Sequence, residues 1–173
     1  DAPPGDATQV GVSYLELPGD VLPGDVLLLD DGVVQLEVTA VEGERIVTRV
    51  LNDCFLSNRK GLNKQGGGLS LGAITEKDRE LIAIAAGMGV DFIAVSFCRN
   101  AEDMHEARRV ARAHGSSAAL VSKIERAEAI ENLGEIVDAS DVVMVARGDL
   151  GVEIGDAELP RLQKKIIREA VAR

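Results

Sequence analysis

The sequence has few cysteines and lacks a long apolar run. Only Cys54 and Cys98 occur in 173 residues, which fits a reducing compartment better than a disulfide-stapled fold. Their spacing indicates no partner, so we expect both thiols to be buried. Because no apolar run reaches about 18 residues and the first residues do not have a signal-peptide pattern, we expect a cytoplasmic protein without a membrane partner.

Positive charge and aromatic side chains are also scarce. The chain has 19 basic against 29 acidic residues, a formal net charge of −10, and only 2% aromatic residues. A nucleic-acid-binding surface needs basic side chains to neutralise phosphates, and single-stranded sites need aromatic stacking platforms. The composition therefore argues against nucleic acid as a partner.

Residues 1–63 have the pattern of a small all-β domain. Valine is abundant, apolar and polar residues partly alternate, and tight turns are predicted at Asp30-Asp31-Gly32 and Glu42-Gly43-Glu44. The predicted strands lie within the segments Val26–Gly32, Val33–Gly43 and Glu44–Cys54. Short strands at this spacing indicate a small β-barrel or sandwich.

Residues 64–173 change to alternating strands and helices. Apolar strands are predicted at Asp91–Phe97, Ala118–Ile124 and Asp141–Ala146. Helices are predicted from Thr75 to about Met88 and over Asn100–His114, Arg126–Val137 and Ala157–Ala172. This order is typical of a parallel sheet with both faces covered, so the fold class is α/β plus all-β.

Polar residues follow each of the three predicted parallel strands. Ser96 lies at the end of the first, Lys123 and Glu125 end the second, and Arg147, Gly148 and Asp149 follow the third. Sites in such folds form at the carboxyl ends of the strands. Glu125 and Asp149 together could hold Mg²⁺, with Lys123 adding positive charge beside an anionic substrate.

Each of these residues also has a plainer interpretation. Lys123 and Glu125 could form a surface ion pair, Asp149 could be a turn residue, and Ser96 could cap the next helix, although Asn100 is better placed. Taken singly, each plain interpretation is favoured. The recurrence at three successive strand ends favours a functional site.

Several motifs in order along the chain resemble the pyruvate kinase family. The most specific are SKIERAEAIENL (122–133) and ASDVVMVARGDLGVEI (139–154), and LPRLQKKIIREA (159–170) follows them. Upstream, DDG (30–32), RKGLN (59–63), TEKD (75–78) and GVDFIAVSF (89–97) match in the same order. The resemblance covers nearly the whole chain, and the first 25 residues are the least diagnostic.

The resemblance implies a role for particular residues. Lys123 would stabilise the transferring phosphoryl group and the enolate-like transition state, and Glu125 and Asp149 would bind the divalent metal. The turn Ala146-Arg147-Gly148-Asp149 would hold the substrate carboxylate through backbone N–H groups, with Ser96 lining the pocket. Lys60 would lie on the nucleotide side, and Asp30 would be a lid residue.

The resemblance also implies an architecture and a reaction. Residues 1–63 would be a β-barrel lid inserted into a (β/α)₈ TIM barrel, of which residues 64–173 form the central part. The family transfers phosphoryl from phosphoenolpyruvate to ADP in glycolysis, giving pyruvate and ATP. It uses Mg²⁺ or Mn²⁺ and often K⁺, whose ligands would precede this sequence, and we expect a homotetrameric parent enzyme in the cytoplasm.

Two departures from the family pattern bear on activity. Lys64-Gln65-Gly66-Gly67-Gly68 replaces a Leu-Pro-Gly turn, which we interpret as ordinary drift in a flexible connector. A whole barrel needs about 250 residues, so we expect an internal fragment that is inactive alone. The alternatives are a Mg²⁺-dependent lyase acting on phosphoenolpyruvate or pyruvate, and a non-catalytic structural fragment.

Overall fold

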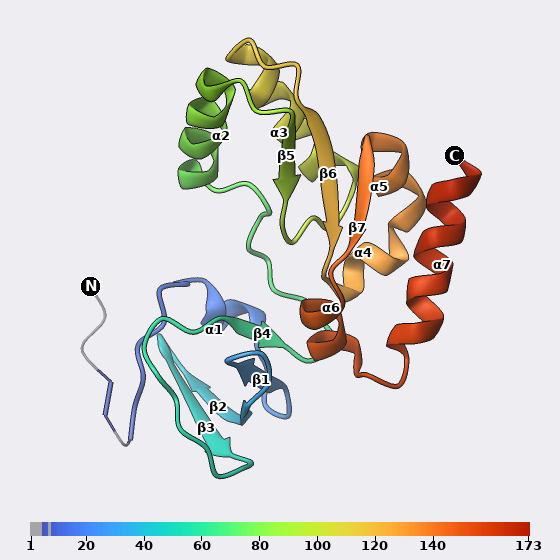
Figure 1. Ribbon diagram of the computed structural model, residues 1–173. Helices are drawn as coiled ribbons and strands as arrows, with labels where there is room; N and C mark the ends of the chain where they lie inside the picture. Colours follow the sequence, from blue (N-terminus) through green and yellow to red (C-terminus); the bar gives the residue numbers. More distant parts are fainter. Residues whose placement is uncertain (1–4, 7) are drawn as a thin grey trace. The chain divides into compact units, whose positions relative to one another are not determined.

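The computed structural model describes residues 5, 6 and 8–173 (Figure 1). These residues form two compact units. The first contains the chain up to Lys64 together with Gly68–Leu71, and the second contains Gln65–Gly67 and Gly72–Arg173. The fold is mixed α and β, with an antiparallel sheet in the first unit and a parallel sheet in the second.

The first unit is built on a four-stranded antiparallel sheet in the order β3-β2-β1-β4. Its elements are α1 (Leu17–Asp20), β1 (Val26–Leu29), β2 (Val34–Glu42), β3 (Arg45–Val50) and β4 (Leu62–Lys64). Both predicted turns are present, since Asp30, Asp31 and Gly43 all have positive φ. Buried apolar side chains of α1, β1 and β2 form its core, with Leu17, Leu27 and Val38 nearly inaccessible.

The second unit contains a three-stranded parallel sheet in the order β5-β6-β7. The strands are β5 (Phe92–Val95), β6 (Ala119–Ile124) and β7 (Val142–Val145). The helices are α2 (Glu76–Met88), α3 (Ala101–Ala113), α4 (Ala127–Glu131), α5 (Leu133–Ala139), α6 (Arg147–Ile154) and α7 (Leu159–Ala172). The predicted alternation of strands and helices is therefore confirmed.

Helices cover one face of the parallel sheet, and this arrangement creates the core of the second unit (Figure 1). Alternate strand residues such as Ile93, Leu120 and Ile124 are buried there. The other residues of the edge strands, including Phe92, Val142 and Met144, are substantially exposed. The sequence interpretation of a sheet covered on both faces is therefore wrong for the described part of the chain.

The predicted helix Arg126–Val137 is two helices. Asn132 separates α4 from α5 with φ −97° and ψ 18°, outside the regular helical range. Its side-chain amide donates to the carbonyl of Arg99 at 2.9 Å. A tertiary hydrogen bond thus interrupts a segment whose local pattern is helical.

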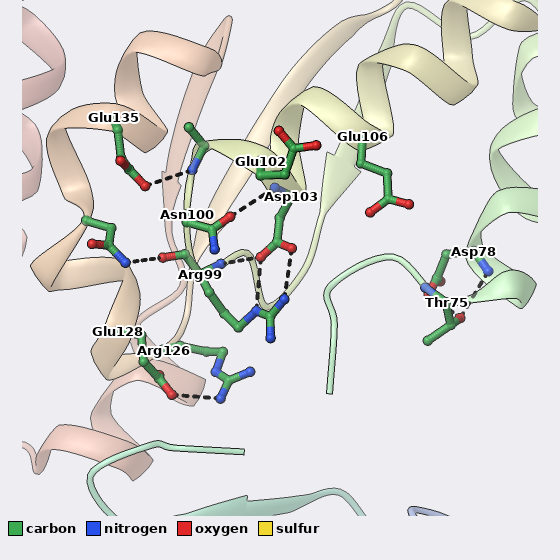
Figure 2. Close-up of polar contacts among 12 residues, drawn as sticks. Thr75, Asp78, Arg99, Asn100, Glu102, Asp103, Glu106, Arg126, Glu128 and Glu135 are labelled. Carbon is green, nitrogen blue, oxygen red and sulfur yellow. Dashed lines mark hydrogen bonds and ion pairs between the residues drawn. The ribbon is translucent and has the colours of Figure 1, made fainter. Parts of the chain in front are cut away.

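Side-chain caps fix where two helices begin. Thr75 and Asp78 form a reciprocal capping box at the start of α2. The Asn100 side chain accepts from the amide of Asp103 at the start of α3, so Asn100 and not Ser96 caps this helix (Figure 2). Each cap ends a strand-to-helix connection at a defined residue and so determines the path of the connection.

Two findings concern the scarce features of the sequence. Cys98 is buried as expected, but Cys54 is exposed, so that expectation is wrong for Cys54. Cys54 follows β3 in an irregular segment that contributes little to the core.

None of the helices in the described part of the chain is long and apolar enough to cross a membrane.

Candidate functional site

The register of the parallel sheet brings its three strand ends to one edge. Val95 of β5 pairs with Ser122 of β6, and Ile124 of β6 pairs with Val145 of β7. The amide of Ala146 donates to the carbonyl of Ile124 at 3.3 Å, extending this alignment beyond the strands. The residues that follow each strand are therefore neighbours, as the sequence predicted.

Lys123 contacts two polar side chains of this edge. Its ammonium donates to the Ser96 hydroxyl at 2.9 Å and forms an ion pair with Glu125. The Lys123 side chain is 26% exposed, whereas that of Glu125 is 1% exposed. A cation that solvent reaches therefore lies over a carboxylate that solvent does not reach.

The two carboxylate oxygens of Glu125 have different surroundings. Oε2 accepts a hydrogen bond of 2.6 Å from the backbone amide of Phe97. Oε1 is buried and faces Lys123, yet among the described residues no hydrogen bond of normal geometry reaches it. The Lys123 cation is therefore the partner of Oε1 among the described residues, and a buried carboxylate oxygen is costly without a cation or a donor.

This donor set fits one side of a divalent-metal site. Hard cations such as Mg²⁺ bind carboxylate oxygens and keep several water or substrate oxygens. Glu125 supplies such an oxygen, and Asp149 lies half-buried in the first turn of α6. No cluster of three or more His, Cys, Asp or Glu side chains suited to a metal occurs within the described residues. Any metal held here would need further ligands from water or substrate.

The segment Arg147–Asp149 is the first turn of a helix, one of the two kinds of backbone anion site that the sequence interpretation considered. Helix α6 begins at Arg147 directly after β7, and Ala146 is its N-cap without a side-chain hydrogen bond. The first intrahelical bond runs from the amide of Leu150 to the carbonyl of Ala146. The amides of Arg147, Gly148 and Asp149 precede that bond and so have no intrahelical acceptor, which is the geometry of an anion site.

Lys60 and Asp30 belong to the first unit and contact each other. The Lys60 ammonium lies 2.9 Å from a carboxylate oxygen of Asp30, and both side chains are partly exposed. Asp30 opens the turn between β1 and β2, and Lys60 precedes β4. Separate roles were predicted for Lys60 and Asp30 from the sequence, but their ion pair was not.

The segment after β5 contains contacts that the sequence did not reveal. Phe97 has a left-handed backbone with φ 56°, and the Cys98 thiol donates to the carbonyl of Lys123 at 3.4 Å. The guanidinium of Arg99 donates to both oxygens of Asp103, which also accepts from the Arg99 amide (Figure 2). No sequence signal indicates these contacts, because they join residues through backbone groups and tertiary packing.

The glycine segment Gly66–Gly68 is not a free connector. The amide of Gly66 donates to the carbonyl of Glu153 at 3.1 Å. A Cβ on Gly67 would lie 2.6 Å from a carboxylate oxygen of Glu128. The buried Glu153 also accepts from the amide of Ala127 at 2.9 Å, two residues after Glu125. Gly67 thus allows close packing against α4, and Gly66 is bonded to α6 through its amide, which the interpretation as a flexible connector missed.

Burial also determines the chemistry of Cys98. The thiol is completely inaccessible, and burial, with the negative charges of Asp103 and Glu125, raises its pKa to about 12. A thiol with this pKa is protonated at neutral pH and unreactive. Cys98 is therefore a structural residue whose thiol contacts the backbone of Lys123.

Comparisons with known proteins point to one family. A family model described as the barrel domain of pyruvate kinase matches residues 2–173. A pyruvate kinase II from Salmonella typhimurium is 57% identical over 169 residues, covering 96% of this chain and 35% of that protein. Pyruvate kinases from Haemophilus influenzae and Geobacillus stearothermophilus are 54% and 45% identical, and the matches cover 37% and 29% of their lengths.

The chain spans about a third of the length of the curated relatives it matches. The family match nevertheless extends over nearly all of its residues and includes every strand end described above. This chain therefore belongs to the pyruvate kinase family.

Proposed function

We propose that this chain carries the metal-binding and phosphoryl-stabilising part of a pyruvate kinase active site. The parent reaction moves phosphoryl from phosphoenolpyruvate to ADP, giving pyruvate and ATP in glycolysis. The observation that carries the proposal is the Lys123, Glu125 and Ser96 cluster at the carboxyl edge of β5 and β6. Helix α6 starts at the same edge and offers backbone donors for an anion.

The residues divide the chemistry between them. Lys123 places a partly solvent-accessible positive charge where negative charge develops on the enolate oxygen and the transferring phosphoryl group. Glu125 and Asp149 would hold Mg²⁺ or Mn²⁺, which supplies Lewis-acid polarisation of the substrate oxygens when bound. The amides of Arg147, Gly148 and Asp149, which follow the N-cap Ala146 at the start of α6, would hold the substrate carboxylate, and Ser96 positions Lys123.

The proposed architecture assigns the two predicted domains to two tasks. Residues 1–63 would be the lid, with Lys60 on the nucleotide side and Asp30 facing the active site when the lid closes. Residues 64–173 would be the central part of a (β/α)₈ barrel. Lid closure excludes water, which would otherwise compete with ADP as the phosphoryl acceptor.

The remaining ligands of the parent enzyme belong to segments that these 173 residues do not include. In this proposal they supply the arginine that contacts phosphate and the ligands of K⁺. The parent enzyme would be a cytoplasmic homotetramer. Since the reaction needs these groups, we expect the chain alone to show no turnover in a coupled assay with Mg²⁺, K⁺, phosphoenolpyruvate and ADP.

The positive test places this chain in a complete enzyme. The chain would replace the corresponding segment of the Salmonella typhimurium pyruvate kinase II, which is 57% identical. The chimera should convert phosphoenolpyruvate and ADP, and Lys123→Met should lower its kcat by about a thousandfold or more. Arg161→Met, which changes an exposed cation on α7, is the matched control.

Two results of this test would contradict the proposal. A folded, tetrameric chimera without turnover would show that these residues do not complete a pyruvate kinase site. Full turnover of the Lys123→Met chimera would show that the Lys123, Glu125 and Ser96 cluster does not stabilise the transferring phosphoryl group. Loss of phosphoryl transfer would also argue against the lyase alternative, whose aldol chemistry depends less on this lysine.

A further inference from the structure

Phe97 has a backbone conformation that its side chain does not explain. Its φ of 56° lies in the left-handed region, which is unfavourable for bulky L-residues. Among the described residues of the second unit, it is the only non-glycine residue with positive φ. Phe97 is 41% exposed, so burial of the ring does not impose this conformation.

The conformation has a backbone consequence. Because the chain after Phe97 is anchored through Cys98 and Arg99, the φ of Phe97 sets the orientation of the peptide before it, whose N–H donates to Oε2 of Glu125 at 2.6 Å. A hydrogen bond from an amide to a buried carboxylate is strong and directional. With Oε2 engaged, the second oxygen, Oε1, is presented on the side of Lys123.

The surrounding residues hold this conformation from both sides. Before Phe97, the Ser96 hydroxyl accepts from Lys123. After it, the Cys98 thiol donates to the carbonyl of Lys123. The Arg99 amide donates to Asp103 at 2.8 Å, and the Arg99 carbonyl accepts from Asn132 at 2.9 Å. Figure 2 shows Arg99 held by Asp103 at the start of α3. A strained residue persists where its neighbours determine its position in this way.

We infer that the left-handed Phe97 is a positioning residue that orients Glu125 so that Oε1 is preset for a divalent cation. The backbone amide, not the aromatic ring, performs this role. Position 97 should accept residues that adopt positive φ and reject those that do not. The inference rests on the proposed function, because it takes Glu125 to be a metal ligand.

The test compares substitutions at one exposed position by their backbone preference. Phe97→Gly and Phe97→Asn retain access to the left-handed region, whereas Phe97→Val, being β-branched, strongly disfavours it. The probe is Mn²⁺, and its affinity for the full chain is measured by electron paramagnetic resonance. Circular dichroism verifies that each variant is folded, and Glu125→Gln reports on the ligand itself.

We expect the wild-type chain, Phe97→Gly and Phe97→Asn to bind Mn²⁺ with similar affinity. Phe97→Val should bind about ten- to a hundredfold more weakly, the range for losing a partner that orients a metal ligand. If Phe97→Val does not fold, Phe97→Ala replaces it, and its affinity should fall below that of Phe97→Gly. Recovery by glycine and asparagine separates backbone positioning from a packing role of the ring.

The unfavourable outcomes identify which claim fails. If Glu125→Gln abolishes Mn²⁺ binding but folded Phe97→Val binds like the wild type, the positioning role is overturned and the proposed function stands. If Glu125→Gln binds Mn²⁺ like the wild type, Glu125 is not a metal ligand, and the inference that Phe97 orients it for a metal is overturned. If the wild-type chain does not bind Mn²⁺, Oε1 is not preset in this chain and the inference is overturned, while turnover of the chimera still tests the function.

Discussion

The two units place the same kinds of side chain in very different surroundings. Lys60 pairs with Asp30 in the first unit, and their side chains are 37% and 25% exposed. Lys123 pairs with Glu125 in the second, where the carboxylate is 1% exposed. Cys54 is exposed in the first unit and Cys98 is buried in the second. The difference shows that residue type and spacing can suggest which side chains form an ion pair. Burial determines how much that ion pair contributes to the stability of the fold.

The two left-handed segments differ in the same way. Asp30 and Asp31 adopt positive φ in a turn that ends with Gly32, where aspartate is common. Phe97 adopts it two residues after the half-buried strand β5, where nothing in the local sequence requires it. Local turn chemistry explains the first case, and tertiary contacts explain the second. Each prediction below compares one change in the second unit with a matched feature of the first.

The largest contrast should be in thiol reactivity. At pH 8 the exposed Cys54 should react with a disulfide reagent at least about a thousandfold faster than Cys98, whose pKa is raised to about 12 and whose sulfur is inaccessible. Mass spectrometry of the singly labelled chain identifies the site. Urea should make both thiols reactive. Equal rates in the folded chain would contradict the burial of Cys98.

The next contrast concerns the two lysines. Lys123→Met should lower the free energy of unfolding by about 3 kcal/mol, because the buried Glu125 carboxylate would lose its cationic partner. Lys60→Met should cost less than about 1 kcal/mol, since its pair is solvated. Urea unfolding followed by circular dichroism measures both.

A second substitution separates charge from packing at Lys123. Adding Glu125→Gln to Lys123→Met removes the unpaired charge and should recover about half of the lost stability. If the double variant is as unstable as the sum of the single variants, the ion pair does not couple these residues, and the contrast with Lys60 and Asp30 has another cause.

Two glycines with positive φ provide a smaller contrast. Gly67→Ala should destabilise the chain by about 2 kcal/mol, since the added Cβ is unfavourable at φ 79° and must also displace Glu128. Glu128 is paired with the buried Arg126, which limits how easily it moves (Figure 2). Gly43→Ala has only the backbone cost, about 1 kcal/mol, because nothing crowds its Cβ. Thermal unfolding of the two variants measures the difference, and equal costs would show that Glu128 relaxes freely.

The smallest contrast should appear in the acid dependence of stability. A hydrogen bond from the amide of Leu120, with the charge of Arg108, lowers the pKa of Asp141 below its ordinary value of 3.8. At Asp20 the largest single influence is burial, which raises the pKa. Hydrogen bonds from Tyr14 and Ser70 together outweigh it, so the pKa of Asp20 is also lowered. A lowered folded-state pKa stabilises the chain above about pH 4 and loses this contribution as pH falls through the folded value.

Replacing either aspartate by asparagine should therefore make the free energy of unfolding fall less steeply with pH below about pH 4. We expect a clear flattening for Asp141→Asn and a weaker one for Asp20→Asn, measured by urea unfolding at several pH values. A steeper acid loss in Asp141→Asn than in the wild type would contradict the sign of the shift.

Much of the second unit could be predicted from the sequence because its signals are local. The strand ends, the Thr75 and Asn100 caps, and the proximity of Lys123 to Ser96 follow from apolar runs, cap residues and parallel register. The break at Asn132, the conformation of Phe97 and the packing of Gly67 depend on residues distant in sequence. No periodicity or propensity encodes such contacts, and an aromatic residue is among the last expected at positive φ.

The path of the chain between the units affects how the protein can be divided by genetic truncation. Three residues after β4, Gln65–Gly67, belong to the second unit, and the chain then returns to the first unit for Gly68–Leu71. There the amide of Ser70 donates to Asp20 at 2.7 Å, and its hydroxyl contacts that of Tyr14 at 2.8 Å. A first unit ending at Lys64 would lose these contacts, whereas one ending after Leu71 would keep them. No single cut therefore separates the units without leaving residues of one attached to the other.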